Sequence, residues 1–142
     1  MASPDLSYKL TFELRPEYLF VGVESDYMNE EIALDYLGKI GAKAHEEDID
    51  RLMVVRNVPV MLSDADLFTT TNFFMGLMSG KRVAFVNPHA AIADDMEFAI
   101  RIGTNRGAVY GLFDNEQTAE EWLLDLGETI SELDTSVEPF SD

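Results

Sequence analysis

The amino-acid sequence predicts a single α/β domain with a mixed, mostly parallel sheet and helices mainly on one face. The chain opens with residues that alternate between apolar and polar, a period typical of strands. Short apolar stretches then alternate with segments of helical periodicity, which favours parallel strands joined by right-handed crossovers. The length of 142 residues also lies in the usual range for one domain. The expected order of elements is β-β-α-β-α-β-α-β-α.

The first two strands are expected to form a hairpin. Apolar and polar residues alternate from Tyr8 to Arg15, so one face of this strand should be buried and the other exposed to solvent. Pro16-Glu17 predicts a turn, and Tyr18 to Val23 is a more continuous apolar stretch. The first strand therefore lies at an edge of the sheet, antiparallel to the second.

Helices and strands alternate through the rest of the domain. Asp26 or Asn29 can cap the first helix, which has an apolar face of Ile32, Ala33, Tyr36, Leu37, Ile40 and Ala44. The next two helices are expected from Ser63 to about Met78 and from Ala90 to Ile102, with Gly103 as the C-cap of the latter. The remaining strands are expected at Leu52–Val55, Arg82–Val86 and Ala108–Phe113.

The last helix should begin at Asp114, with Gln117 completing a capping box. Its face predicts strong amphipathic packing with a buried Trp122, and consists of Ala119, Trp122, Leu123, Leu126, Ile130 and Leu133. The domain is thus expected to span residues 8–133. Residues 1–7 are expected to be a frayed N-terminus, and residues 134–142 a flexible acidic tail.

Charge and composition exclude several classes of function. The formal net charge is −17, from 27 acidic and 10 basic residues, and such a surface repels nucleic acids and anionic lipids. The absence of cysteine excludes disulfides and thiol chemistry. No signal peptide is visible, and no apolar run approaches the ~20 residues that span a bilayer. We therefore expect a cytoplasmic protein without an integral membrane segment.

Three stretches carry a resemblance to a known fold. They are Tyr18–Glu24 before a helix, Lys81–Val86 before another, and Asn105–Gly107 entering the last strand, followed by Phe113–Glu116 and Glu121–Leu123. With the order of elements, these resemble the STAS-like fold of anti-sigma factor antagonists and sulfate transporter cytoplasmic domains, and small bacterial STAS-like or CRAL-TRIO-like proteins. The resemblance covers roughly Tyr8 to Leu133. It implies a superhelix of four β-α turns and a module that acts through protein contacts.

Ser63 is a possible phosphosite on this resemblance. Anti-sigma factor antagonists carry a phosphorylatable serine at the start of the second helix, and matching on Val58-Pro59 places Ser63 there. The surroundings differ, because Leu62 stands where an aspartate is expected and Asp64 follows the serine. Ser63 also fits a plain N-cap, with Asp66 at the capping-box position, and this is the interpretation we favour.

Two residues are candidate anion contacts. His89 follows Asn87-Pro88 at the edge where the carboxyl ends of parallel strands open, and ligands favour that edge. Arg106 is one of few cations and could bind an anionic ligand. A structural or surface role is the alternative for both residues.

No catalytic or metal-binding pattern is present in the sequence. Glycine-rich phosphate loops and the G-x-S-x-G elbow are absent. The acidic runs lack diagnostic spacing and are interpreted as solvated faces: Glu46–Asp48, Asp64–Asp66 and Asp94-Asp95. We therefore expect no metal, no cofactor and no enzymatic activity. An enzyme that uses carboxylates with His89 is the weakest hypothesis.

The second helix is more apolar than one buried stripe requires. The surplus predicts an interface or an apolar-ligand surface made by Phe68, Phe73, Phe74, Met75 and Met78. Our first hypothesis is a non-enzymatic interaction or regulatory module, expected to be a homodimer or to bind another regulatory protein. The alternative is a binder of a small apolar or lipid-like ligand in a hydrophobic pocket.

Overall fold

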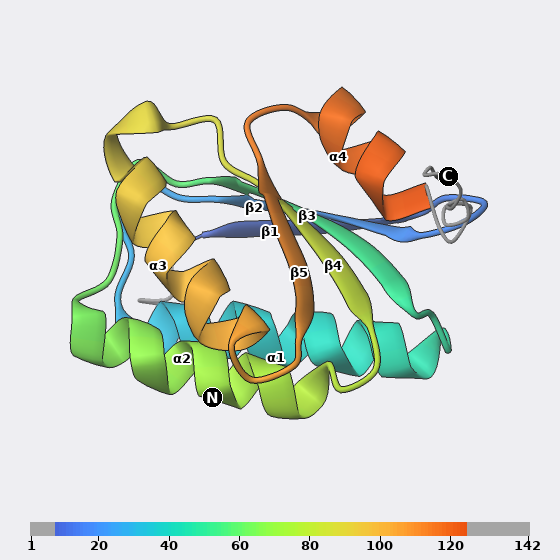
Figure 1. Cartoon of the computed structure of the whole chain (residues 1–142), viewed down its shortest axis with the longest axis horizontal. Helices are drawn as coiled ribbons and strands as arrows, with labels where there is room; N and C mark the ends of the chain where they lie inside the picture. Colours follow the sequence, from blue (N-terminus) through green and yellow to red (C-terminus); the bar gives the residue numbers. More distant parts are fainter. Residues whose placement is uncertain (1–7, 125–142) are drawn as a thin grey trace, which may run out of the picture.

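The computed structural model describes residues 8–124, which fold into a five-stranded mixed sheet covered by helices (Figure 1). The strands are β1 (Lys9–Leu14), β2 (Leu19–Glu24), β3 (Arg51–Asn57), β4 (Arg82–Val86) and β5 (Val109–Phe113). The helices are α1 (Glu30–Glu46), α2 (Asp64–Leu77), the 3₁₀ turn η1 (Ala90–Ile92), α3 (Ala93–Thr104) and α4 (Glu116–Leu124). The predicted α/β class and order of elements are confirmed.

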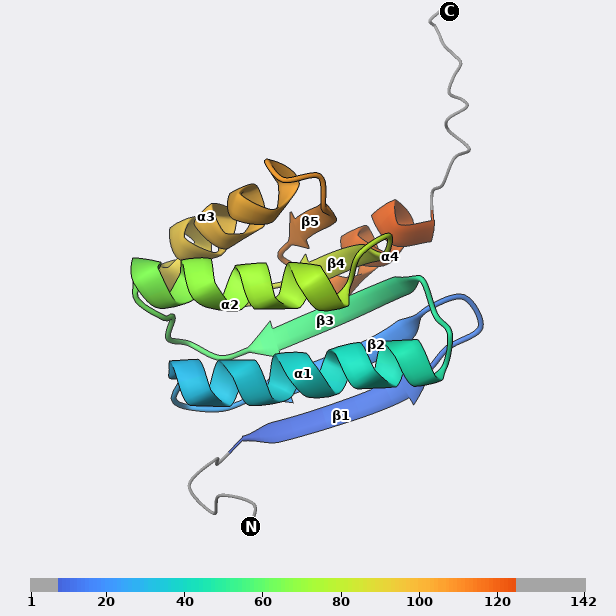
Figure 2. The same ribbon diagram turned by 90° about the horizontal axis from the view of Figure 1, so that it is seen from below.

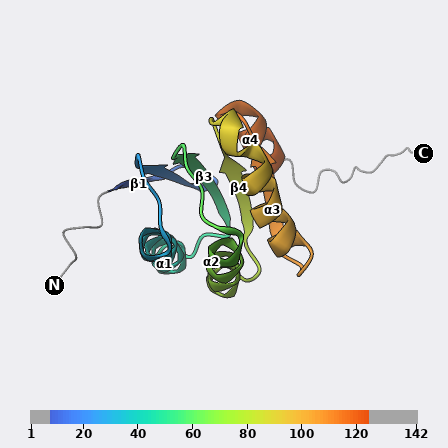
Figure 3. The ribbon, with the colours of Figure 1, turned by 90° about the vertical axis from the view of Figure 1, so that its left-hand side faces the viewer.

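The strands lie side by side in chain order, β1-β2-β3-β4-β5. β1 pairs antiparallel with β2, and all other neighbours pair in parallel. From β2 onward, each crossover places the next strand on the same side of the preceding one. Right-handed connections in one direction place their helices, α1, α2 and α3, on one face of the sheet. Figures 2 and 3 show α1 and α2 side by side beneath the sheet, with α3 beside α2 at the β5 end. α4 lies on the opposite face, over β3, β4 and β5.

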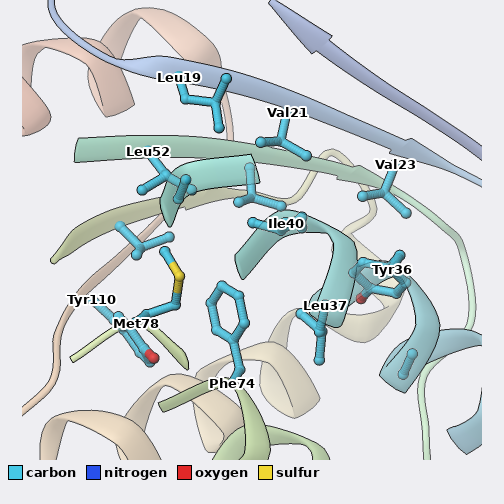
Figure 4. Close-up of a cluster of buried hydrophobic side chains, with 14 of the residues drawn as sticks. Leu19, Val21, Val23, Tyr36, Leu37, Ile40, Leu52, Phe74, Met78 and Tyr110 are labelled. Atoms are coloured by element: carbon cyan, nitrogen blue, oxygen red, sulfur yellow. The ribbon is translucent and has the colours of Figure 1, made fainter. Parts of the chain in front are cut away.

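The main core lies between the sheet and the three-helix layer (Figure 4). β2 and β3 direct alternate residues into it, because successive side chains of a strand point to opposite faces. The predicted apolar face of α1 is confirmed, since all six of its members are buried. Strand and helix residues meet in this layer, among them Leu19, Val21, Val23, Leu52, Ile40 and Phe74.

A second, smaller core lies under α4 on the other face of the sheet. Its buried members are Tyr18, Met53, Ala84, Val86, Ala119 and Leu123. The expectation that Trp122 is buried is wrong, because the indole is only half-buried at the border of this core. The Arg82 guanidinium lies over the Trp122 ring, 3.9 Å from its centroid.

Side-chain caps start three helices. Asn29, and not Asp26, accepts from the Ile32 amide at 2.8 Å and begins α1. The predicted start of the last helix at Asp114 is wrong by one residue, because Asn115 accepts from the Thr118 amide at 2.9 Å. Asn29 was one of the two expected caps, so only the start of the last helix is corrected. In both places several nearby polar residues could cap, and backbone geometry selects one.

The predicted C-cap at Gly103 is also wrong. Gly103 lies within α3 and is buried, and the Tyr110 ring occupies the space where a side chain would stand, 2.6 Å from an ideal Cβ. The left-handed backbone falls at Gly107, with φ of 95°. The third helix also begins later than predicted, after the η1 turn.

Several expectations lie outside the described residues. These are the frayed segment 1–7, the tail 134–142, and the last-helix residues Leu126, Ile130 and Leu133. No helix within residues 8–124 combines the length and the apolar character needed to cross a membrane.

Candidate functional site

A cavity of about 70 Å³ lies between α1, α2, α3 and the helix-covered face of the sheet. We name it the central cavity. Its walls are mostly apolar and include Leu37, Val54, Leu67, Phe74, Phe85 and Ile100. Arg56 and Tyr110 also line it. No described residue that lines this cavity is Asp, Glu or His.

Arg56 is a buried cation near the carboxyl end of β3. It continues the alternation of Leu52 and Val54, so its side chain lies on the helix-covered face and is only 4% exposed. Its Nη1 donates to the Val58 carbonyl at 3.1 Å and its Nη2 donates to the Val60 carbonyl at 2.9 Å.

Arg56 forms no ion pair with a carboxylate among residues 8–124. A buried charge without a counter-ion is costly. The hydrogen bonds to the two carbonyl oxygens offset part of this cost.

Tyr110 is a buried hydroxyl on β5, 8% exposed. Its ring centroid lies 6.2 Å from that of Phe74 and 5.4 Å from that of Phe85, and Gly103 leaves the room that the ring needs. The hydroxyl oxygen has no hydrogen-bond partner within the described part of the chain. Burial raises the pKa of this hydroxyl to about 12, so it is a neutral O–H donor at physiological pH.

The central cavity therefore offers hydrogen-bond donors set in apolar walls. Thr70, which also lines it, already donates its hydroxyl to the Asp66 carbonyl at 2.9 Å. Arg56 is a hydrogen-bond donor in the lining, whereas the Tyr110 hydroxyl oxygen is fully buried and has no partner among the described residues. This chemistry suits the recognition of a small molecule that carries acceptor oxygens.

The structure divides the predicted residues of the second helix between two environments. Phe74 is 3% exposed and Met78 is buried, so both belong to the main core, and Phe74 also lines the central cavity. Phe73 is 41% exposed and Phe68 is 46% exposed, while Met75 is half-buried. Of the two adjacent rings, Phe73 is the one that points outward.

Phe73 and Leu77 form an exposed apolar ridge along α2, which we name the α2 ridge. Its members pack across glycines of α1: the Phe73 ring lies 3.8 Å from where a Cβ of Gly38 would stand, and Leu77 lies 2.9 Å from that of Gly41. Gly41 lets Leu77 approach α1 closely, whereas a Cβ at Gly38 would make only an ordinary van der Waals contact with Phe73. Both ridge side chains nevertheless keep about 40% of their surface exposed.

The two predicted anion contacts lie at opposite ends of the parallel strands. His89 follows β4, and its Nε2 lies 2.7 Å from Asn57 Oδ1. Arg106 precedes β5, lies 4.8 Å from the Phe68 ring centroid and donates to Asn72 Oδ1 at 2.6 Å. Because the length of the parallel strands separates these ends, the structure does not bring His89 and Arg106 together. Their binding of an anion stays a prediction.

Ser63 is the N-cap of α2, as predicted. Its Oγ accepts from the Asp66 amide at 3.2 Å, and its side chain is exposed. The phosphosite interpretation stays a prediction.

Sequence reasoning missed Arg56 and Tyr110. The third strand was expected to end at Val55, which left Arg56 in a loop. Extension of the period-two pattern by one residue would have placed Arg56 on the buried face. Tyr110 lies within a correctly predicted strand, but no local pattern reveals that its hydroxyl lacks a partner.

Comparisons of the chain with family models, with curated proteins and with solved structures gave no match. Within residues 8–124, no group of three or more metal-ligating side chains is positioned to hold a metal ion.

Proposed function

We propose that the chain is a non-enzymatic, cytoplasmic, STAS-like interaction module that acts through protein contacts, and that it pairs with a second copy of itself through the α2 ridge. The support is the order of elements on which the resemblance rests, with three helices on one face of the sheet. The observation that carries the proposal is the exposure of Phe73 and Leu77 on one helix.

Charge favours α2 as the meeting surface. Two copies of a chain with net charge −17 repel each other over most of their surfaces. From Leu67 to Gly80 the chain carries no charged side chain, and the α2 ridge lies within this stretch. Apolar contact at an uncharged centre, with acids kept at the rim, is the usual anatomy of an interface.

The outward side of α2 also has room for a second helix. Ala65, Thr69 and Gly76 are exposed and follow one another along the helix at intervals of four and seven residues. Such intervals place residues on one side of a helix. An added Cβ at Gly76 meets no atom within 4 Å, so this surface is open. Two α2 helices could approach closely here, with Phe73 of each packed against the other.

Sedimentation of the parent and of Phe73→Glu tests the proposal. The parent should sediment as a dimer and Phe73→Glu as a monomer, because a carboxylate would be buried at the centre of the contact. Phe98→Glu is the matched control, since Phe98 of α3 is 38% exposed and lies on a different helix. It should remain dimeric. A monomeric parent at high concentration would contradict the proposal.

Binding of a small ligand in the central cavity is the second candidate function, and the presence of the cavity favours it. The volume of about 70 Å³ is far below the roughly 300–1,000 Å³ of typical drug-sized ligand sites. A compact molecule fits this volume better than a lipid chain.

A further inference from the structure

We propose that the segment 125–142 of this chain lies beside α4, across β1, β2 and the carboxyl end of β3, and covers a hollow in that part of the sheet. The occupant of the hollow is therefore a part of the same molecule. This inference goes beyond the proposed function, because the hollow and the α2 ridge lie on opposite sides of the sheet.

The hollow lies where the sheet has no helix over it. Within residues 8–124, α4 is the one helix on this face, and it lies over β3, β4 and β5 (Figure 3). Phe20 and Gly22 of β2 alternate with core residues such as Val21, so they lie on the α4 side of the sheet. Thr11 of β1 and Val55 of β3 are the register partners of Gly22. These four residues line a hollow of about 230 Å³, which we name the β2 hollow.

The path of α4 brings the chain to the β2 hollow. α4 begins after β5 and crosses the sheet toward β2, where the Tyr18 hydroxyl donates to Glu120 Oε2 at 3.0 Å. Leu124, the last described residue, packs against the same small core as Phe20 and Val55. The segment that follows Leu124 therefore starts beside the hollow.

The segment 125–142 has the length and the apolar residues that a cover needs. Its eighteen residues would span about 27 Å as a helix and up to about 60 Å if extended. Neighbouring strands lie about 4.8 Å apart, so β2 and β1 are within reach in either form. Four apolar residues follow one another at intervals of four, three and four, the spacing of one side of a helix: Leu126, Ile130, Leu133 and Val137.

Charge around the β2 hollow is balanced, unlike the charge of the whole chain. The Arg15 guanidinium lies 4.1 Å from the Phe20 ring centroid, so a cation borders the apolar floor. Among the described residues on this part of the sheet and in its hairpin turn, three cations stand against three acids: Lys9, Arg15 and Arg51 against Glu13, Glu17 and Glu24. The segment 125–142 carries six acids and no cation. This surface therefore repels the segment less than the acidic remainder of the molecule does.

A nitroxide spin label in the segment tests the proposal, and the absence of cysteine allows the label to be attached at one chosen position. The full-length chain with Ser131→Cys carries the label, and broadening of amide signals in NMR spectra identifies the residues near it. We expect the Phe20, Gly22 and Val55 signals to lose intensity. The amide of Gly76, on the exposed side of α2, should keep its intensity. Equal intensities at Gly22 and Gly76 would overturn the proposal.

Matched variants of the spin-labelled chain test whether apolar contact holds the segment in place. Ile130→Asp combined with Leu133→Asp should restore the Gly22 signal, because burial of two carboxylates against an apolar floor is costly. Thr129→Asp combined with Thr135→Asp adds the same charge at polar positions and should leave the Gly22 signal broadened. Equal restoration by both pairs would show that apolar contact does not hold the segment, which contradicts the proposal. All four substitutions lie outside the core of residues 8–124.

A mixed sample distinguishes the chain's own segment from that of a second copy. Protein that is ¹⁵N-labelled and carries no nitroxide is mixed with unlabelled protein that carries the nitroxide at Ser131→Cys. The Gly22 signal should keep its intensity in this mixture. A loss of intensity as large as in the singly labelled sample would mean that a second copy covers the β2 hollow, and the proposal would be wrong. Sedimentation of Phe73→Glu tests the α2 ridge separately, so the two proposals can fail independently.

Discussion

The Tyr110 hydroxyl makes the stability of the fold sensitive to alkaline pH. Burial raises its pKa to about 12, whereas the unfolded chain titrates near 10. Above pH 10 the unfolded state loses this proton first, so the native state binds more protons and the free energy of unfolding falls as pH rises. Titration of this group leaves the free energy of unfolding unchanged below pH 10 and lowers it as pH rises toward 12, at up to about 1.4 kcal/mol per pH unit.

Tyr110→Phe removes the titrating hydroxyl, so the free energy of unfolding should fall less steeply as pH rises. Urea unfolding of parent and variant between pH 9 and pH 12 measures the difference. Tyr8 titrates in the same range, because burial and a hydrogen bond to Asp35 raise its pKa to about 12, so the variant should keep part of the slope. Identical slopes in parent and variant would show that the Tyr110 hydroxyl is not desolvated.

Gly103 and Gly76 provide a matched pair of helix glycines. A Cβ at Gly103 would stand 2.6 Å from a Tyr110 ring carbon, whereas a Cβ at Gly76 meets nothing within 4 Å. Gly103→Ala should therefore destabilise by about 1–3 kcal/mol, as overpacking does. Gly76→Ala should stabilise by about 0.5–1 kcal/mol, through the loss of backbone freedom in the unfolded chain. Chemical denaturation measures both, and equal effects would contradict the packing of Tyr110 against α3.

The cap of α2 depends on one exposed hydroxyl. Ser63→Ala should cost about 1 kcal/mol, because the Asp66 amide loses its acceptor. Ser63→Asp keeps an acceptor and places a negative charge at the helix N-terminus, so its stability should stay within about 1 kcal/mol of the parent. Thermal unfolding of the two variants checks this order. Equal losses would indicate that the hydroxyl does more than cap the helix.

Element type and order were predictable because periodicity is a local property. The alternation from Tyr8 and the six-residue face of α1 each identify an element and its buried side. α2 was predicted as a helix, but its buried side was not, since apolar residues surround most of its circumference. Phe73 and Phe74 are distinguished only by contact with α1 and the sheet. The central cavity was unpredictable for the same reason, because residues of three helices and three strands line it.

The molecule has an exposed apolar surface on one helix, α2, while the chain as a whole is strongly acidic. The sheet is covered on one face by α1, α2 and α3, and α4 covers only β3 to β5 on the other. Of the residues described, eight large apolar side chains are exposed, and three of these belong to α2. If two copies meet there, their apolar contact opposes a long-range repulsion between two charges of −17.

That opposition predicts an association constant that rises with salt. Salt shortens the screening length from about 30 Å at 0.01 M to about 8 Å at 0.15 M, which weakens the repulsion but leaves the apolar contact unaffected. Sedimentation equilibrium at these two ionic strengths should therefore show more dimer at the higher one. The association constant of Phe98→Glu should rise with salt as that of the parent does and be slightly smaller, since the variant adds charge outside the contact. Phe73→Glu should stay monomeric at both ionic strengths. An association constant that falls with salt would mean that ion pairs hold the copies together, and the α2 ridge would then not be the interface.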